Sequence, residues 1–339
     1  MPIVLDAMGS DDFPNPEVDA AFQAAEIFDT KIFIVGQKEK LQPLLDQKPD
    51  DPRVVFVHAP EILEMTDKPA RNARRKADNS MAVGMDLVKT GEANAFVTAG
   101  NTGGALANGL FRLGRIQGVK RPALTTVLPT KKGFAIIVDI GANADCKPLH
   151  LLQFGIMGSI YSEKVLGVDL PKVALLSNGE EEGKGNQLVK DAFPLFKNSA
   201  LNFIGNAEPK EFFNGEVDVI VCDGFSGNVF IKTSESVSKM LLEIMKQELT
   251  GSFRTKIGAA LAMPAFKHLR EILDPRQIGA APLLGIDGLV FVGHGRSDDL
   301  ALVNSIKRAK QAIDSQLLPN LKEAIQSQLS KSTGHAGED

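Results

Sequence analysis

Glycine and small polar residues follow directly after four apolar, β-rich runs in this chain. The runs are residues 93–99, 134–138, 173–176 and 217–222, and the loops after them are 100–104, 139–143, 177–186 and 223–228. Glycine lets a backbone approach a ligand closely, and the start of a following helix offers unpaired N–H groups to an anion. Because ligands bind at the carboxyl ends of strands in open α/β sheets, we expect these loops and residues 6–11 to open on one edge. The pattern predicts a site for a phosphate-like or oxyanionic group.

Single residues in these loops allow more than one interpretation. Lys184, between glycines, could place a point charge on a phosphate, or it could be a solvated loop lysine. Asn101 could donate to a ligand or cap the helix that follows it. Asp139 and Asp223 could order neighbouring donors, bind a metal or cap a helix. The sequence leaves these alternatives open.

Standard catalytic and nucleotide-binding motifs are missing from the sequence. Residues 179–185 resemble a P-loop but have the wrong spacing, and no G-x-G-x-x-G follows the first strand. Residues 224–227 lack the spacing of a nucleophile elbow. No H-E-x-x-H or paired C-x-x-C occurs, and Cys146 and Cys222 have no His at metal-ligand spacing. We therefore expect transfer chemistry by binding and positioning, with no metal and no covalent Ser or Cys intermediate.

Composition narrows the class of protein further. The chain has 339 residues, of which 43% are hydrophobic, enough for one large α/β unit or two subdomains. A net charge of −4 gives no overall attraction to nucleic acid, and two cysteines make no disulfide framework. The N-terminus enters a strand at once, and no apolar run approaches the ~18 residues of a membrane span. We expect a cytosolic protein.

Strands and helices alternate along the chain, which predicts a three-layer α/β/α fold with a mainly parallel sheet. Strands are expected at 3–5, 31–35 and 54–58, and helices at 16–28, 39–45, 80–90, 149–165, 229–249 and 299–317. The link at 129–133 is so short that strands 123–128 and 134–138 must form an antiparallel hairpin, which makes the sheet mixed. The helix at 149–165 is apolar enough to lie in the core or at a dimer interface.

Residues 250–275 stand apart from this alternation. Pro264 is expected to break or bend this segment into two amphipathic helices, and this hairpin either packs on the body or protrudes and touches a membrane surface. The residues of the proposed tip are Phe253, Ile257, Leu261, Met263 and Phe266. The rest of the chain is expected to form one α/β unit of two intertwined subdomains (about 1–125 with 276–325, and 126–249), with a flexible tail at 330–339.

A basic run after residue 58 is either a solvated face or a docking surface for an acidic partner. Its members are Arg71, Arg74, Arg75 and Lys76, with Lys68 before them.

The ordered set of motifs resembles the bacterial phosphate:acyl-carrier-protein acyltransferases, the PlsX family. The likeness is carried, in order, by residues 6–11, 74–76 with 80–81, 99–105, 139–143, 184–186, 223–228, and Gly285 with 293–295. Each motif alone is weak, but the ordered set covers residues 1 to about 315 and is highly specific. One mild departure is the pair Asp298 and Asp299.

The resemblance implies that a long-chain acyl group passes from a carrier-protein thioester to inorganic phosphate, giving acyl phosphate for phospholipid synthesis. It implies a fold like that of the isocitrate and isopropylmalate dehydrogenases, related to the phosphotransacetylases. It also implies a cytosolic, peripherally membrane-associated homodimer without a cofactor. The implied partners are acyl carrier protein, phosphate, a glycerol-phosphate acyltransferase that uses acyl phosphate, and the membrane surface, and no nucleic acid.

The residues expected to act follow from the same motifs. Lys184, Asn228, Asp223 and Asn101 are expected to be catalytic, with Lys184 and the amides of 101–104 on phosphate and either Asn228 or a loop N–H facing the thioester oxygen. The expected phosphate and substrate contacts are Asp6, Gly9, Thr102, Gly103, Gly104, Asp139, Asn143, Gly185, Asn186, Ser226 and Gly227. Arg71, Arg74, Arg75 and Lys76, or alternatively the basic residues near Lys267, are expected to receive the carrier protein. Replacing Lys184 by Ala is expected to reduce phosphate-dependent turnover.

Three other functions share parts of this pattern. A phosphotransacetylase-like enzyme would use coenzyme A instead of carrier protein. A decarboxylating dehydrogenase would need grouped metal-binding aspartates, whereas the aspartates here are scattered, one in each loop. A non-catalytic scaffold would bind carrier protein or membrane through the basic run and residues 250–275.

Overall fold

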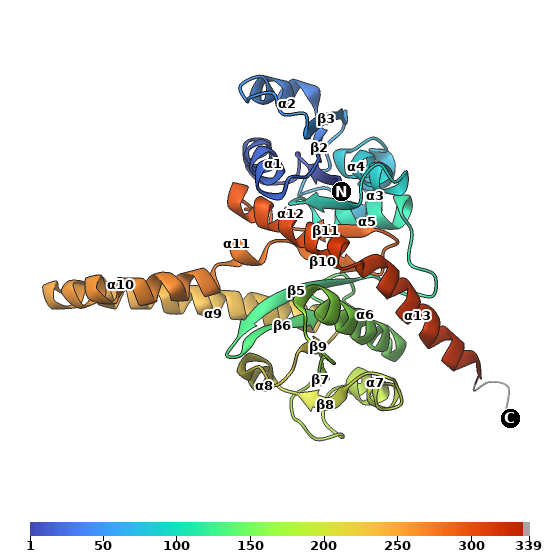
Figure 1. Cartoon of the computed structure of the whole chain (residues 1–339). Helices are drawn as coiled ribbons and strands as arrows, with labels where there is room; N and C mark the ends of the chain where they lie inside the picture. The colour runs from blue at the N-terminus through green and yellow to red at the C-terminus, as the bar shows by residue number, and fades with distance from the viewer. Residues whose placement is uncertain (335–339) are drawn as a thin grey trace.

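Eleven strands form one continuous sheet in the order β3-β2-β1-β4-β11-β10-β5-β6-β9-β7-β8 (Figure 1). The computed structural model describes the backbone of residues 1–334 and the side chains of 1–267, 274 and 276–328. The strands are β1 Ile3–Asp6, β2 Ile32–Gly36, β3 Val54–His58, β4 Ala95–Thr98, β5 Ala123–Thr130, β6 Gly133–Val138, β7 Val173–Leu176, β8 Phe203–Ala207, β9 Val219–Val221, β10 Ala281–Leu284 and β11 Leu289–Val292.

Helices connect these strands and cover the sheet. They are α1 Asn15–Phe28, α2 Lys38–Leu45, α3 Pro69–Arg75, α4 Ser80–Lys89, α5 Thr102–Arg112, α6 Pro148–Leu166, α7 Gln187–Lys197, α8 Pro209–Asn214, α9 Gly224–Thr250, α10 Phe253–Leu273, α11 Pro275–Ile278, α12 Asp299–Asp314 and α13 Leu317–Gly334. The predicted alternation is confirmed within a few residues for the elements that the sequence pattern marked.

Alternate residues of each strand enter different hydrophobic clusters, which makes the molecule three layers deep. Ile3 and Leu5 pack with α1, α12 and α6, whereas Val4 packs on the opposite face with α4 and α5. Ile137 likewise joins a cluster under α8 and α9. This alternation is the two-residue period of a strand that is buried on both faces. The predicted α/β/α architecture is confirmed.

The centre of the sheet reverses the strand direction. Strands β3, β2, β1, β4 and β11 are parallel, and β6, β9, β7 and β8 are parallel to one another. Between these groups β11/β10, β10/β5 and β5/β6 are all antiparallel. The predicted hairpin of β5 and β6 is confirmed. Three reversals leave β6 running opposite to β11, so the two parallel groups have opposite directions.

Helix α6 lies inside the core of the second group. It contacts α7, α13, β6 and β9, and Phe154, Met157 and Tyr161 on it are fully buried. Of the two expected positions for this apolar helix, the structure shows the core.

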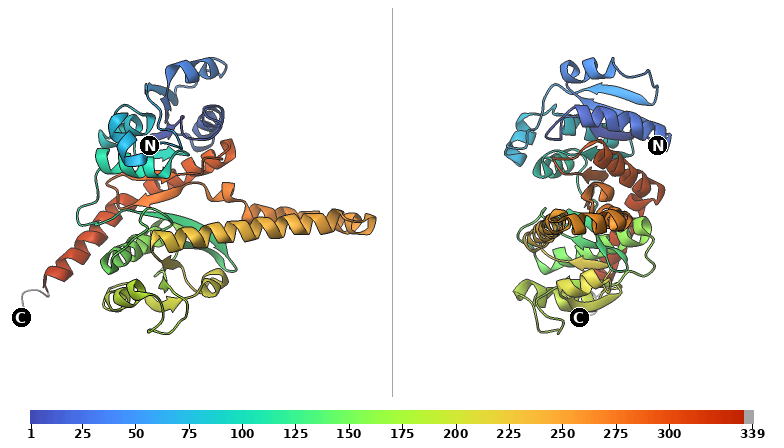
Figure 2. Two further views of the ribbon diagram at one scale, coloured as in Figure 1. Left: turned by 180° about the vertical axis from the view of Figure 1, so that it is seen from behind. Right: turned by 90° about the vertical axis from the view of Figure 1, so that its left-hand side faces the viewer.

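Helices α9 and α10 form an antiparallel arm that projects from the body (Figure 1, Figure 2). Helix α10 runs without interruption through Pro264, so the expected division into two helices there is wrong. Proline removes one backbone hydrogen bond, and the rest of a long helix tolerates that loss. The chain instead turns at Gly251 and Ser252, and Ser252 caps α10 by accepting from the Thr255 amide. The protruding hairpin is therefore longer than residues 250–275, because α9 is its first half.

The first part of the expected C-terminal tail is helical. Helix α13 continues to Gly334, so the expected tail from residue 330 is helical over its first five positions, and 335–339 lie outside the described residues. Across the described chain, no helix combines the length and the apolar character needed to cross a membrane.

Candidate active site

The strand-end loops gather in two clusters at opposite edges of the sheet. The first cluster consists of residues 6–11, 100–104 and 293–297, after β1, β4 and β11. The second cluster consists of 139–143, 177–186 and 223–228, after β6, β7 and β9. The expectation that all loops open on one edge is wrong, because the antiparallel strands β10 and β5 turn the second group around.

This separation bears directly on Asn101 and Lys184. Asn101 follows β4 and Lys184 follows β7, which is six strand positions away in the sheet order. At about 4.8 Å per step the lateral separation is about 29 Å, far more than a lysine side chain spans. Within one chain, these two residues cannot hold the same phosphate.

Asp6 organises the base of the first cluster. Its carboxylate accepts from the Thr98 hydroxyl at 2.7 Å and from the Met8 amide at 3.1 Å, and it has no exposed surface. Burial raises the pKa of Asp6, and the hydrogen bonds from Thr98 and its other donors oppose that shift. Gly9 lies so close to the next loop that a Cβ there would stand 2.7 Å from the Gly100 nitrogen. Asp6 thus positions the loops and Gly9 permits their close approach.

Asn101 caps α5 and ties it to a neighbouring segment. Its Oδ1 accepts from the Gly104 amide at 2.9 Å, and its Nδ2 donates to the Met65 carbonyl at 2.9 Å. The helix-cap interpretation of Asn101 is confirmed, and its side chain is fully engaged. The first-turn amides of Thr102 and Gly103 make no hydrogen bond within the described chain, as expected for the open start of a helix. These two N–H groups can receive an anion.

The loop at 293–297 completes the first cluster. The Gly293 amide donates to the Thr98 carbonyl at 2.7 Å, and the Asp11 amide donates to the Gly295 carbonyl at 2.6 Å. Arg296 and His294 are exposed on this loop, and His294 Nε2 lies 3.8 Å from the Glu235 carboxylate of α9. The sequence analysis assigned no role to Arg296. An apolar run at 289–292 followed by glycines is the same signal that marked the other loops and could have found it.

Glu17, in α1 beneath residues 8–13, is a second buried carboxylate of the first cluster that the sequence did not reveal. One oxygen accepts from the Ser10 amide at 3.1 Å, and the other has no hydrogen bond in the described part of the chain. The Ser10 hydroxyl lies near this carboxyl without a hydrogen-bond geometry. Burial raises the pKa of Glu17 to about 7, and the Ser10 contacts oppose the shift.

The second cluster is closed by its own hydrogen bonds around Asp139. The Asp139 carboxylate accepts from the amides of Leu124, Gly141, Ala142 and Asn143 and from Asn143 Nδ2, at 2.7–3.2 Å. Burial raises its pKa, and these donors oppose the shift. Asp139 has no exposed surface and Asn143 is buried, so both residues hold the loop together.

The segment 223–228 forms the first turn of α9. The helix was expected from residue 229, but it begins at Gly224, with Asp223 as its cap. Asp223 accepts from the Ser226 amide at 2.9 Å and from the Ser226 hydroxyl at 2.7 Å, which confirms the capping interpretation. Gly227 packs directly on Asp139, and the exposed Asn228 side chain lies beside Gly141.

The two cysteines lie beside this turn, and neither thiol is suited to act as a nucleophile. Burial raises the pKa of Cys146 to about 12 and also raises that of Cys222. Neither thiol can supply a thiolate near neutral pH.

Lys184 lies in an exposed loop at the outer part of the second cluster. The Gly185 amide donates to Asn178 Oδ1 at 2.9 Å, and Asn186 caps α7 by accepting from the Val189 amide at 3.0 Å. The exposed Lys184 side chain lies against Gly179 of the same loop and makes no ion pair among the described residues. Its contact with phosphate stays a prediction, and Gly185 and Asn186 shape the loop.

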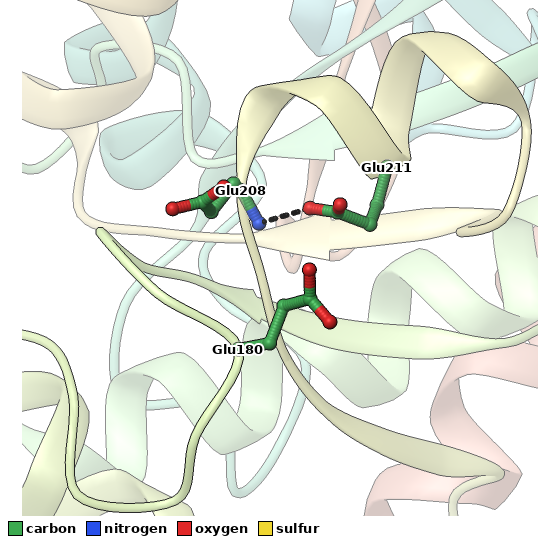
Figure 3. Close-up of side chains that lie close together, drawn as sticks. All are labelled: Glu180, Glu208 and Glu211. Atoms are coloured by element: carbon green, nitrogen blue, oxygen red, sulfur yellow. Dashed lines mark hydrogen bonds between the residues drawn. The ribbon is translucent and has the colours of Figure 1, made fainter.

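Three carboxylates close to this loop come together without forming a cation site. Glu180, Glu208 and Glu211 lie within ligand distance of one another, and Figure 3 shows the Glu208 amide donating to Glu211. The Lys210 ammonium is 3.0–3.3 Å from all three carboxylates. Hydrogen bonds to Glu208, Glu180 and Glu211 raise the pKa of Lys210, so a permanent positive charge already lies among the three carboxylates.

The basic run forms α3 and the residues around it. Helix α3 packs against α5, and Pro69 touches Gly103, which places the run beside the open start of α5. Arg71 and Arg75 are exposed, and the Arg74 guanidinium lies 4.9 Å from the centre of the Phe111 ring. The remaining member, Lys76, is partly buried and ion-paired with Asp67 at 2.6 Å.

The first cluster therefore combines two unpaired amides at a helix start with arginines nearby, a geometry that can receive an oxyanion. Such an arrangement suits a transferase that binds an oxyanion and positions it.

Comparison with known proteins agrees with this class. Residues 1–319 match the model of a family described as "Fatty acid synthesis protein". A phosphate acyltransferase of Pelotomaculum thermopropionicum is 46% identical over 327 residues, covering 96% of each chain. A phosphate acyltransferase of Acidobacterium capsulatum is 47% identical over 311 residues, covering 91% of this chain and 92% of its own. The chain belongs to this phosphate acyltransferase family, which acts in lipid biosynthesis.

Solved structures show the same fold. A phosphotransacetylase of Streptococcus pyogenes superposes with a TM-score of 0.61 at 18% identity, covering 93% of this chain and 94% of its own. The EutD phosphotransacetylase of Staphylococcus aureus gives 0.60 at 18% identity, covering 94% of each chain. At these identities the likeness concerns the fold.

Proposed function

We propose that this transferase moves a long-chain acyl group from the thioester of acyl carrier protein to inorganic phosphate, and that the first cluster is its active site. The observation that carries the proposal is the pair of free amides of Thr102 and Gly103, beside the basic helix α3 and the exposed Arg296. Phosphate placed there would receive two N–H donors and nearby positive charge.

The chemistry needs no activated side chain. A phosphate oxygen attacks the thioester carbonyl carbon, the new C–O bond forms, and the C–S bond breaks. The thiolate leaves on the prosthetic arm of the carrier protein and takes a proton from water. The protein must hold the two substrates in line and stabilise the developing oxyanion with preorganised donors.

In this proposal, some residues of the first cluster bind phosphate, and others position the loops that carry them. Thr102, Gly103 and Arg296 bind phosphate, and Gly9 lets the loops close around it. Asp6 and Asn101 are positioning residues, because their side chains are committed to holding the loops. Gly104 belongs to the same support through its bond to Asn101.

Residues of the second cluster take a supporting role in this proposal. Asp139, Asn143 and Asp223 build its loops, and Ser226 and Gly227 form the tightly packed start of α9. Lys184 is too far from Thr102 to contact the same phosphate in one chain. Asn228 keeps an exposed side chain next to Gly141, but it too lies on the edge opposite the phosphate site.

Carrier protein would dock on α3. Acyl carrier protein is acidic, and Arg71, Arg74 and Arg75 lie beside the start of α5, where its thioester would have to arrive. Lys76 is left out of this surface because Asp67 neutralises it.

The projecting arm would act at a membrane surface. Phe253, Ile257, Leu261 and Met263 are 50–81% exposed near its end, while Phe266 is partly covered. Exposed apolar side chains on a basic helix suit an interface with anionic lipid. Further exposed residues on α9, including Met240 and Leu241, could pair with a second copy in a homodimer. Acyl phosphate made there would pass to a membrane acyltransferase that uses glycerol phosphate.

The decisive experiment is direct detection of the product. The protein is incubated with long-chain acyl carrier protein and phosphate, and acyl phosphate is trapped with hydroxylamine. Parallel reactions contain acyl-coenzyme A in place of carrier protein, or NAD with a hydroxy-acid substrate. Hydroxamate that requires both carrier protein and phosphate supports the proposal. Product from coenzyme A alone would support a phosphotransacetylase-like enzyme, and binding without product would support a scaffold.

A further inference from the structure

A cavity of about 200 Å³ lies beside the first cluster, between residues 8–13 and 62–65. We propose that this cavity binds the part of the donor's acyl chain that follows the thioester carbonyl. The inference rests on the proposed function, because it assigns the apolar half of the same substrate.

The cavity adjoins the phosphate site through a shared wall. Met65 lines it, and the Met65 carbonyl accepts from Asn101, the cap of the helix whose amides would hold phosphate. Asp11 lines the same cavity, and its amide donates to the Gly295 carbonyl in the 293–297 loop. A chain seated here would therefore end with its carbonyl at the start of α5.

The lining chemistry selects a neutral, apolar ligand. Met8, Phe13, Ile62, Leu63 and Met65 supply the apolar surface. Two carboxylates, Asp11 and Glu64, are exposed at the rim, and no basic side chain lines the cavity among the described residues. Carboxylates at the rim disfavour the carboxylate of a free fatty acid inside the cavity, but not the hydrocarbon of a thioester. Methionine adapts its shape to chains of different contour.

The volume indicates partial enclosure of a long chain. Whole-ligand pockets are typically ~300–1,000 Å³, so this cavity holds a segment of the chain while the remainder crosses its rim. Each buried methylene contributes about 0.8 kcal/mol, which corresponds to about fourfold in kcat/KM. Specificity should rise with chain length until the cavity is filled and then level off.

Narrowing the cavity tests this assignment. Met65→Trp adds bulk at the wall, and Leu195→Trp is a matched control, because Leu195 on α7 is 38% exposed and Met65 is 42% exposed. The assay is acyl phosphate formation from carrier-protein donors of increasing chain length. We expect Met65→Trp to lower kcat/KM for long donors at least tenfold, while short donors change less than about twofold. Equal effects at every length, or none, would overturn the inference while leaving the proposed function standing.

A binding measurement separates the cavity from catalysis. The chain contains no tryptophan, so Phe13→Trp introduces a single reporter in the cavity wall. Its emission should shift on addition of a long-chain acyl thioester of N-acetylcysteamine and much less with the matching fatty acid. Leu195→Trp should show no shift. An unresponsive Phe13→Trp protein with intact wild-type turnover would refute the cavity, whereas a clear shift without any acyl phosphate would refute only the proposed reaction.

Discussion

The two strand-end clusters contain similar residues but differ in how their carboxylates are used and in whether a cavity adjoins them. In the second cluster, Asp139 accepts five hydrogen bonds and Asp223 is used as a helix cap. In the first cluster, the amides of Thr102 and Gly103 have no hydrogen bond within the described chain, and a cavity lies beside residues 8–11. The second cluster also has unsatisfied groups, the Ser177 hydroxyl and the Phe225 amide, but neither of the two described cavities is lined by its loops. Glycine, aspartate and asparagine at a strand end can thus build either a closed structural joint or an open site. Unsatisfied donors next to a cavity indicate the open site.

The largest expected effect is on the packing of the second cluster. At Gly227 a Cβ would stand 1.9 Å from the Asp139 carbonyl oxygen, so Gly227→Ala should destabilise the protein by about 3 kcal/mol or more. Gly183→Ala is the control, since nothing lies within 4 Å of its Cβ position. Denaturant unfolding measures both. Equal stability of the two variants would show that the second cluster is not a rigid joint.

A buried carboxylate of the first cluster should make stability depend on pH. The pKa of Glu17 is about 7 in the folded protein against an ordinary 4.5, so the unfolded chain loses this proton first as pH rises. Folding stability then falls between these two values, by about 3 kcal/mol in total. Glu17→Gln should remove that loss, giving greater stability near pH 8 and little change near pH 4. Unfolding curves at both pH values check it, and a constant difference would contradict the assignment.

A carboxylate placed at the start of α5 should block phosphate. Thr102→Asp favours the helix but repels the anion, so turnover should fall about 100-fold with the fold intact. Gln187→Asp makes the same change at the first position of α7, in the second cluster, and should leave turnover nearly unchanged. Steady-state kinetics and circular dichroism test the pair. The reverse ranking would move the phosphate site to the second cluster.

Arg296 of the first cluster and Lys184 of the second are both exposed cations, and replacing each tests which cluster binds phosphate. Arg296→Ala should raise the KM for phosphate about tenfold through loss of a charged contact, whereas Lys184→Ala should leave it within about twofold. This differs from the sequence-based expectation for Lys184. Phosphate titrations at saturating donor decide between them, and a large effect of Lys184→Ala alone would restore the original assignment.

The smallest effect should appear in carrier-protein docking. Combined Arg71→Ala and Arg75→Ala should raise the KM for the protein donor about threefold to fivefold at low salt, because long-range attraction speeds encounter. The difference should shrink as ionic strength rises to about 0.3 M. Lys190→Ala, on α7, is the matched control. Salt-independent KM values in the wild type would argue against an electrostatic docking surface.

Much of the site could be predicted because its signals are local. Apolar runs followed by glycine located β4, β6, β7 and β9, and the spacing of Asn101 and Asp223 before helix starts allowed for their capping roles. Glu17 and the 62–65 wall carried no such signal. Their role depends on α1 and a distant loop packing against residues 8–13, which no local pattern encodes.

The projecting arm also shows that a local sequence signal does not determine the structure when distant segments pack together. Pro264 is a strong local signal, yet α10 passes through it because the remaining hydrogen bonds and the contact with α9 maintain the helix. The actual turn at Gly251 and Ser252 follows from a capping serine and from the position of α9.

The sequence by itself determined the alternating elements, the mixed sheet, the family and the kind of chemistry, since periodicity, glycine loops and missing motifs are written in neighbouring residues. Only the tertiary structure decided which loops meet. Strand order and direction arise from pairings between distant segments, and the antiparallel pairs through β10 and β5 send Lys184 and Asn101 to opposite edges. A site assembled from several strand ends is therefore fixed by sheet topology, which packing and backbone hydrogen bonding across the whole chain select.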